Sequence, residues 1–314
     1  MDYSIFYRRC IQIDRMAQEL GSFDVFISAY NSSDRVKIVF NHINSQKKIW
    51  LIHPEYKYAQ IEHPVGHVVV APAMGDEISQ IHDLLAAVPN INAISLCIDI
   101  TGFMRNSLAF LIPKLAHLGV KSFTAIYSEP ISYSKQEATQ FTTTTSEVVR
   151  PIRGMYGTPG NGQNHLLMAV GYDHQLISQV FSYKNNVISH PLFAFPSLSA
   201  DMYQQSALRA EKSGEIVLKE DWINNRFFAP ANDPFATAGM VSERVRHIDR
   251  KGPGENIFLA PLSTKAQVLG MSIYWLLEGK SRGRCSMLLP ECLTYSRETS
   301  TGLKRLWSYE IELT

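Results

Sequence analysis

The chain has 314 residues, a length that suits two domains of about 150 residues each. Apolar residues make up 45% of it and charged residues 19%, which is typical of a globular protein with a sizeable core. The 30 Lys and Arg residues nearly balance the 29 Asp and Glu residues, leaving a net charge of +1. This balance argues against a protein whose whole surface attracts DNA, RNA or anionic lipid.

The sequence also lacks the usual signals for export, membrane insertion and metal binding. Residues 1–9 contain no apolar run followed by a small-residue cleavage site, and no segment approaches the roughly 18–20 apolar residues that span a bilayer. The four cysteines include no Cys-x-x-Cys pair. We therefore expect a cytoplasmic protein with no metal and no membrane contact.

Residues 1–137 alternate short apolar runs with helical patterns, which is the signature of βαβ units and a mainly parallel sheet. Strands are expected near 23–28, 49–53, 67–71, 93–98 and 122–127. Helices are expected near 5–20, 33–45, 76–88 and 103–118. Asp76 is a suitable N-cap for the third of these helices, and Gly119 is suited to follow the end of the fourth.

Residues 164–314 repeat this α/β pattern. Strands are expected near 165–170, 190–195, 226–229, 257–261 and 284–289, with helices near 174–184, 200–212, 233–249 and 265–278. The stretch 138–163, rich in Thr, Gly and Pro, is interpreted as a linker. The tail 306–313 alternates apolar with polar residues and predicts a closing strand.

The two halves match in order along the chain, which predicts a tandem duplication of a Rossmann-like unit. Tyr172 lies 142 positions after Tyr30, and Pro196 lies 142 positions after Pro54. The run Ile126–Glu129 in the first half corresponds to Leu288–Glu291 in the second half. Each glutamate is followed a few residues later by Tyr-Ser and then a basic residue.

Polar residues follow the predicted strands, and ligands of open parallel sheets bind beyond the carboxyl ends of the strands. The first half offers Tyr30, Asn31, Asp99, Thr101, Arg105, Glu129, Tyr133 and Lys135. The second half offers Tyr172, Asp173, Ser263, Thr264, Lys265, Glu291, Tyr295 and Arg297.

These residue types suit an anionic ligand. Helix N-termini after Thr101 and Thr264 favour negative charge, arginine binds phosphate through paired hydrogen bonds, and tyrosine rings stack on a base or ribose. We therefore expect a nucleotide-like ligand in a cleft between the halves. The alternative is that the same residues cap helices and fill the rim of the sheet.

The run 23–28, followed by Ser32, Ser33 and Asp34, resembles the opening strand of TIR domains, many of which bind or cleave NAD with a glutamate. No Trp-x-x-x-Glu helix follows, so the resemblance assigns no catalytic residue. The plan of two Rossmann-like units is similar to CARF domains, which pair to bind cyclic oligonucleotides. Both resemblances imply nucleotide signalling and antiviral defence.

Three functions remain open at this stage. The first is a ligand sensor that binds a nucleotide-like anion. The second is an enzyme that hydrolyses NAD or a cyclic nucleotide with Glu129 or Glu291, although the chain has no Gly-x-Gly-x-x-Gly, Walker or Gly-x-Ser-x-Gly motif. The third is a structural subunit of a larger complex, with an aromatic docking surface around Trp222, Phe227 and Phe228.

Overall fold

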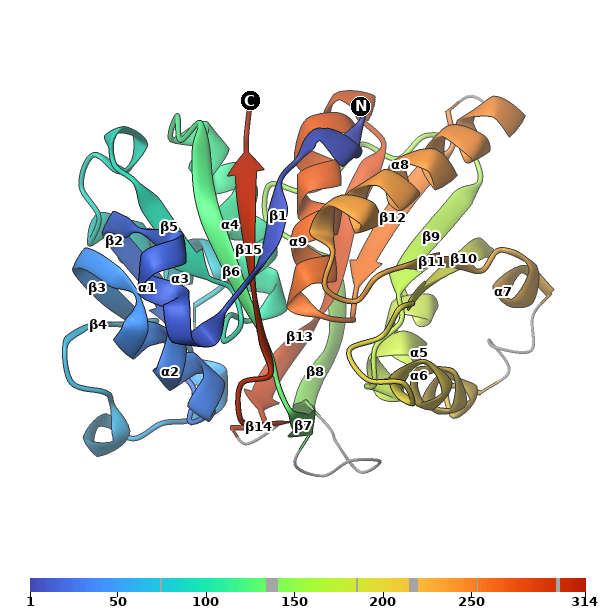
Figure 1. Ribbon diagram of the computed structural model, residues 1–314. Coiled ribbons are helices and arrows are strands. Elements are labelled where there is room, and N and C mark those ends of the chain that lie inside the picture. Colours follow the sequence, from blue (N-terminus) through green and yellow to red (C-terminus); the bar gives the residue numbers. More distant parts are fainter. Residues whose placement is uncertain (74, 134–140, 185, 215–219, 253, 298–299) are drawn as a thin grey trace. The chain divides into compact units, whose positions relative to one another are not determined.

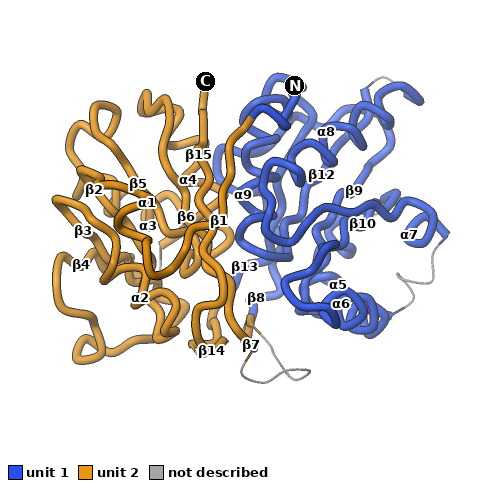
Figure 2. Tube along the Cα trace, viewed as in Figure 1, with its two compact units in different colours: residues 1–5, 145–292 blue, residues 6–144, 293–314 orange. Residues whose placement is uncertain are grey.

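The computed structural model describes residues 1–314 except 74, 134–140, 185, 215–219, 253 and 298–299. It contains two compact units (Figure 2). Unit 1 comprises Met1–Ile5 and Thr145–Cys292, and unit 2 comprises Phe6–Thr144 and Leu293–Thr314. Residues 293–314 therefore lie in the same unit as most of the first half, whereas the sequence prediction assigns them to the second half.

Unit 2 contains a parallel sheet of the five strands predicted from the first half. They are β2 (Ser22–Ala29), β3 (Asn44–Ile52), β4 (His67–Val70), β5 (Leu96–Asp99) and β6 (Ser122–Glu129), in the order β4-β3-β2-β5-β6. The connecting helices are α2 (Asp34–His42), α3 (Glu77–Ala86) and α4 (Arg105–His117). Asp76 caps α3 by accepting a hydrogen bond from the Ser79 amide at 3.1 Å, and Gly119 follows α4 with a φ of +80°, as predicted.

Two antiparallel strands extend this sheet, so that β15 (Arg305–Glu312) lies between β1 (Arg8–Ile11) and β6. In Figure 1 the red strand β15 accordingly lies beside the blue β1 and the green β6. The closing strand is confirmed. The predicted helix 5–20 is wrong, because only α1 (Met16–Leu20) is α-helical there, beside the short 3₁₀ turns Tyr3–Ile5 and Ile13–Arg15. Pairing of β1 with the distant β15 outweighs the local helical spacing.

Unit 1 contains a second parallel set, again of predicted strands. They are β9 (Asn164–Ala169), β10 (Val187–Ala194), β11 (Phe227–Ala229), β12 (Asn256–Pro261) and β13 (Cys285–Tyr295), in the order β11-β10-β9-β12-β13. The helices are α5 (His174–Ser182), α6 (Met202–Glu211), α7 (Glu220–Asn224), α8 (Pro234–Lys251), α9 (Lys265–Tyr274) and α10 (Lys280–Arg282), with a π-helical turn at Trp275–Gly279. The mixed α/β class with mainly parallel sheets is confirmed.

The segment predicted as a linker contains strand β8 (Thr142–Pro151), which neighbours β13 in the same sheet. Its β-branched threonines and valines favour extended backbone, which explains the strand. A separate pair of short strands, β7 (Ser132–Tyr133) and β14 (Ser300–Thr301), lies within unit 2.

The parallel strands of both units have the same order. Numbered along the chain within each unit, they run 3-2-1-4-5, and the order reverses between β2 and β5 in unit 2 and between β9 and β12 in unit 1. Ligands of open α/β sheets bind at this reversal, beyond the carboxyl ends of the strands. Each unit therefore has one position at which this rule predicts a ligand site.

Each unit also has its own aromatic core. In unit 2 the rings of Phe40 and Trp50 stack with centroids 3.5 Å apart, within a cluster that includes Phe26. In unit 1 the fully buried Trp222 packs against Phe181 at 5.6 Å. Burial of Trp222 and Phe227 places both in the core, whereas Phe228 is 40% exposed.

Candidate ligand site

Several of the predicted ligand residues meet at the carboxyl end of β2 in unit 2. We call this group the tyrosine–arginine cluster, and it comprises Tyr30, Tyr56, Tyr58, Tyr295 and Arg297. The sequence predicted Tyr30, Tyr295 and Arg297, and it missed Tyr56 and Tyr58, which lie in the loop after β3.

Tyr30 is held in place by the sheet itself. Its amide donates to the Leu51 carbonyl at 2.9 Å, which continues the pairing of β2 with β3. The ring packs edge-on against Trp50 at 5.4 Å and tilted against Tyr58 at 5.1 Å. Tyr30 and Tyr58 are both half-buried.

The buried Tyr56 closes the point where the strand order reverses. Its hydroxyl donates to the Gly102 carbonyl at 3.0 Å, and the Asn31 amide reaches the same hydroxyl at 3.4 Å. A Cβ at Gly102 would lie 1.9 Å from the Ala29 carbonyl oxygen, so only glycine permits this approach. The space directly between the ends of β2 and β5 is therefore filled by protein.

Arg297 anchors the segment after β13 to the loop after β3. Its Nε donates to the Tyr56 carbonyl at 2.6 Å, one terminal nitrogen donates to the Lys57 carbonyl, and the other pairs with Glu62 at 2.8 Å. The guanidinium carbon lies 4.4 Å from the centre of the Tyr58 ring. A guanidinium has five N–H donors, and three of them make the contacts above. Two N–H donors are therefore left over within the described residues.

The electrostatics of the cluster keep its phenols neutral. Burial raises the pKa of Tyr30 and of Tyr58, and it raises the pKa of Tyr56 well above the usual value. The hydroxyls of these three tyrosines therefore stay protonated near neutral pH, and Arg297 and Glu62 form an ion pair beside them.

Asp99 and Thr101, predicted to bind ligand, are used inside unit 2. Asp99 is fully buried and accepts hydrogen bonds from the Ser28 hydroxyl at 3.1 Å and from the Thr101 amide at 3.0 Å. The Thr101 hydroxyl accepts from the Ser128 amide at 3.0 Å. Burial raises the pKa of Asp99.

Glu129 is likewise buried, at 1% exposure. Its carboxylate accepts from the Trp307 indole at 2.6 Å and lies 3.8 Å from Arg305. Tyr133 packs against Phe141 at 5.7 Å. Arg105 begins α4, and Lys135 falls outside the described residues.

In unit 1 the backbone at Gly171, just before Tyr172 and Asp173, lies against Leu262 and Ser263, since a Cβ at Gly171 would lie 2.1 Å from the Leu262 carbonyl oxygen. Both predicted residues after β9 are buried, and the Arg209 guanidinium carbon lies 4.3 Å from the centre of the Tyr172 ring.

Thr264 and Lys265 start α9. The Thr264 hydroxyl accepts from the Gln267 amide at 3.2 Å and donates to the Ala231 carbonyl at 2.6 Å, so it caps the helix. Lys265 is 8% exposed. Glu291 lies in β13, where it pairs with Arg150 at 2.6 Å and accepts from the Ser146 hydroxyl at 3.1 Å. The second predicted Glu-Tyr-Ser-Arg element is therefore divided, with Glu291 in unit 1 and Tyr295 and Arg297 in unit 2.

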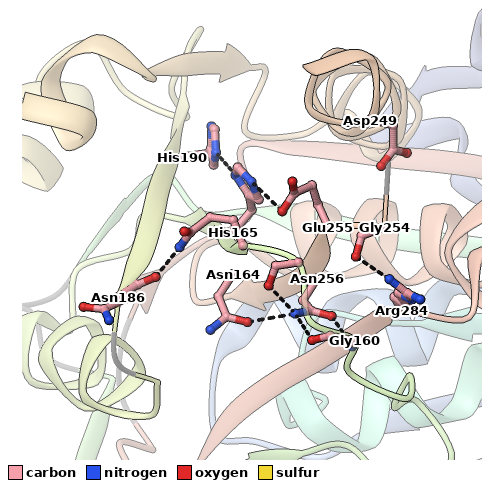
Figure 3. A network of polar contacts seen from close by, with 12 residues as sticks. Gly160, Asn164, His165, Asn186, His190, Asp249, Gly254, Glu255, Asn256 and Arg284 are labelled. Atoms are coloured by element: carbon pink, nitrogen blue, oxygen red, sulfur yellow. Dashed lines mark hydrogen bonds and ion pairs between the residues drawn. The ribbon is translucent and has the colours of Figure 1, made fainter. Parts of the chain in front are cut away.

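A buried histidine pair near the amino end of β9 was missed by the sequence reasoning (Figure 3). His165 Nδ1 lies 3.0 Å from His190 Nε2, and His165 Nε2 lies 3.7 Å from Glu255. In the parallel register His165 faces Ile188, so His190 is its diagonal neighbour on the same face of the sheet. Histidines at the first positions of the predicted strands 165–170 and 190–195 were the available signal.

The loop before β9 is tied to this end of the sheet by Asn256. The Asn256 amide donates to the carbonyls of Gly160 and Gly162 and to Asn164, and its oxygen accepts from the Gly160 amide at 2.8 Å (Figure 3). The glycine-rich loop is therefore held by side-chain contacts of Asn256 within unit 1.

Comparison with known proteins gives no family assignment. No family model matches the chain, and neither the curated proteins nor the solved structures contain a significant match. Within the described residues, no helix has both the length and the apolarity to cross a bilayer. The same part of the chain contains no group of three His, Cys, Asp or Glu side chains arranged to hold a metal ion.

Proposed function

We propose that this protein binds an anionic, nucleotide-like ligand at the tyrosine–arginine cluster of unit 2, as a sensor or scaffold. The observation that carries the proposal is Arg297, which lies over Tyr58 at the carboxyl end of β2 and, among the described residues, keeps two N–H donors beyond the contacts given above. Arginine is suited to bind phosphate oxygens through paired hydrogen bonds.

The surrounding rings suit the rest of such a ligand. Tyr30 and Tyr58 are each partly exposed, and stacking of a base on a tyrosine ring contributes about 1–3 kcal/mol per base in nucleic-acid complexes. Glu62 is expected to weaken binding of the anion, because its carboxylate already pairs with Arg297 at 2.8 Å. The ligand thus competes with a solvated carboxylate for the same guanidinium.

The shared strand order supports a tandem duplication of a Rossmann-like unit, with β2 and β9 as equivalent first strands. In that arrangement the turn after the first strand is the usual place for a bound phosphate, and Tyr30 and Ser32 lie there in unit 2. The contacts of Glu129 and Glu291 with Trp307, Arg305, Arg150 and Ser146 favour structural roles for both carboxylates, which supports binding over hydrolysis.

Isothermal titration against AMP, ATP, NAD and a cyclic dinucleotide tests the proposal. We expect at least one of them to bind, and we expect Arg297→Gln to weaken that binding about tenfold or more, because a charge-assisted hydrogen bond is lost. Glu62→Gln is expected to strengthen it a few-fold, since it frees Arg297 from a competing partner.

Arg250→Gln is the matched control, because Arg250 is an exposed arginine on α8 of unit 1. It should bind as the wild type does. Circular dichroism confirms that each variant is folded. Absence of heat with every ligand in a folded sample would refute the proposed site. A change of nucleotide affinity in the same direction in Arg297→Gln and Glu62→Gln would also refute it.

A further inference from the structure

A second position in unit 2 has the form of a ligand site and shares no residue with the tyrosine–arginine cluster. It is a surface hollow of about 640 Å³ beside β1 and the start of β15. Ligand pockets fall in the range of roughly 300–1,000 Å³, so the hollow has room for a small organic molecule. Its lining comprises Cys10, Ile11, Gln12, Ile13, Asp14, His42, Lys304 and Arg305.

The lining carries more positive than negative charge. Lys304 and Arg305 are both exposed, and Asp14 is the one carboxylate among the lining residues. Within the described residues, the Lys304 ammonium makes no hydrogen bond or ion pair, while its amide is fixed by the Glu129 carbonyl at 2.8 Å. Arg305 lies 3.8 Å from the buried Glu129, and its side chain is 53% exposed, so about half of the side chain is open to solvent.

His42 adds a third basic group, at the last residue of α2. Its Nδ1 lies 2.8 Å from the Ile38 carbonyl and therefore donates to it, which leaves Nε2 for a ligand. The carbonyls at this helix end would repel an anion, but Lys48 donates to the Phe40 carbonyl at 2.7 Å and to the Asn41 carbonyl at 3.3 Å. The Lys48 ammonium therefore offsets the negative end of the helix.

The remaining lining is suited to an apolar body. Ile13 is 36% exposed, and the Cys10 thiol, on an exposed residue, contributes a polarisable surface. We propose that this hollow binds a small organic anion, with a phosphate or carboxylate head held by Lys304 and Arg305 and an apolar portion against Ile13 and Cys10.

Cys10 provides a built-in reporter for the test. Phenyl phosphate serves as the probe, and the rate of Cys10 alkylation by iodoacetamide is measured by peptide mass spectrometry. Partial burial of the thiol, together with the nearby Glu129 and Glu19 carboxylates, raises the pKa of Cys10, so the reaction is run at pH 8.5 or above to make it measurable. Cys292 is half-buried and lies outside the hollow, and its alkylation in the same sample is the internal control.

We expect phenyl phosphate to slow alkylation of Cys10 in a saturable way and to leave Cys292 unchanged. Lys304→Gln should require about tenfold more phenyl phosphate for the same protection, whereas Lys121→Gln, an exposed lysine of the same unit, should behave as wild type. Unchanged alkylation of Cys10, equal protection in Lys304→Gln and wild type, or equal protection by phenol would each overturn the proposal.

Discussion

The buried histidine pair of unit 1 makes the stability of the protein dependent on pH. His190 is 4% exposed, and its burial, together with the nearby His165, Arg244, His247 and Lys251, lowers its pKa from 6.5 to about 3. Because the folded pKa lies below the unfolded value, this contribution to stability is complete above pH 6.5 and is lost as the pH falls towards 3. One pKa unit corresponds to about 1.4 kcal/mol, so we expect a loss of about 2 kcal/mol between pH 7 and pH 5.

The hydrogen bonds of the pair identify a suitable variant. The Glu255 carboxylate, 3.7 Å from His165 Nε2, favours the tautomer with a proton on that nitrogen, in which His165 Nδ1 accepts from His190 Nε2. The other nitrogen of His190 has no hydrogen-bond partner within the described residues. In His190→Gln an amide donor can replace Nε2–H, and no proton is taken up between pH 7 and pH 5.

The assay is urea unfolding of wild type and His190→Gln at pH 7 and pH 5, with hydrogen exchange of β9 peptides to report on unit 1 by itself. The wild type should lose about 2 kcal/mol more than the variant over this interval. His165→Gln should also reduce the dependence on pH, because burial lowers the pKa of His165 as well. An equal change in the free energy of unfolding between pH 7 and pH 5 in wild type and His190→Gln would show that the pair does not stay neutral in the folded state.

Two further predictions concern packing. Gly102→Ala should destabilise unit 2 by about 1–3 kcal/mol, since the new Cβ would lie 1.9 Å from the Ala29 carbonyl oxygen, whereas Gly239→Ala, inside α8 with its nearest neighbour at 3.8 Å, should be neutral or stabilising by about 1 kcal/mol. Urea unfolding measures the free energy of unfolding of both variants. Equal changes in Gly102→Ala and Gly239→Ala would contradict the packing described around these glycines. Trp222→Ala should cost about 3–5 kcal/mol because the side chain is fully buried, whereas the 40% exposed Phe228→Ala should cost about 1 kcal/mol or less. A mild effect of Trp222→Ala on the melting temperature would place this residue outside the core.

The parallel strands could be predicted from the sequence because their apolar runs are local signals. Those of 23–28 and 165–170 end in polar turns and match β2 and β9 closely. The region 5–20 could not be predicted in the same way, since its spacing of apolar residues fits a helix while β1 is set by pairing with β15. The strand β8 was obscured by the glycines and prolines that follow its threonines.

The candidate site was predicted in part. Tyr30 and Arg297 were found because they follow strand-like runs, whereas Tyr56 and Tyr58 lie in a loop that only the folded chain brings to the end of β2. Asp99 ends a strand-like run just as Tyr30 follows one, yet its carboxylate accepts hydrogen bonds inside unit 2. A polar residue after a strand thus indicates a position, and its neighbours decide whether it is available. The expectation that the halves share one ligand cleft stays a prediction.

The most direct test of the proposed function is a crystal structure of the protein soaked with the nucleotide that binds most tightly in titration. We expect its phosphate within hydrogen-bond distance of Arg297 and its base against the Tyr30 or Tyr58 ring. Clear density for the nucleotide at any other place, with Arg297 bound only to Tyr56, Lys57 and Glu62, would contradict the proposed function.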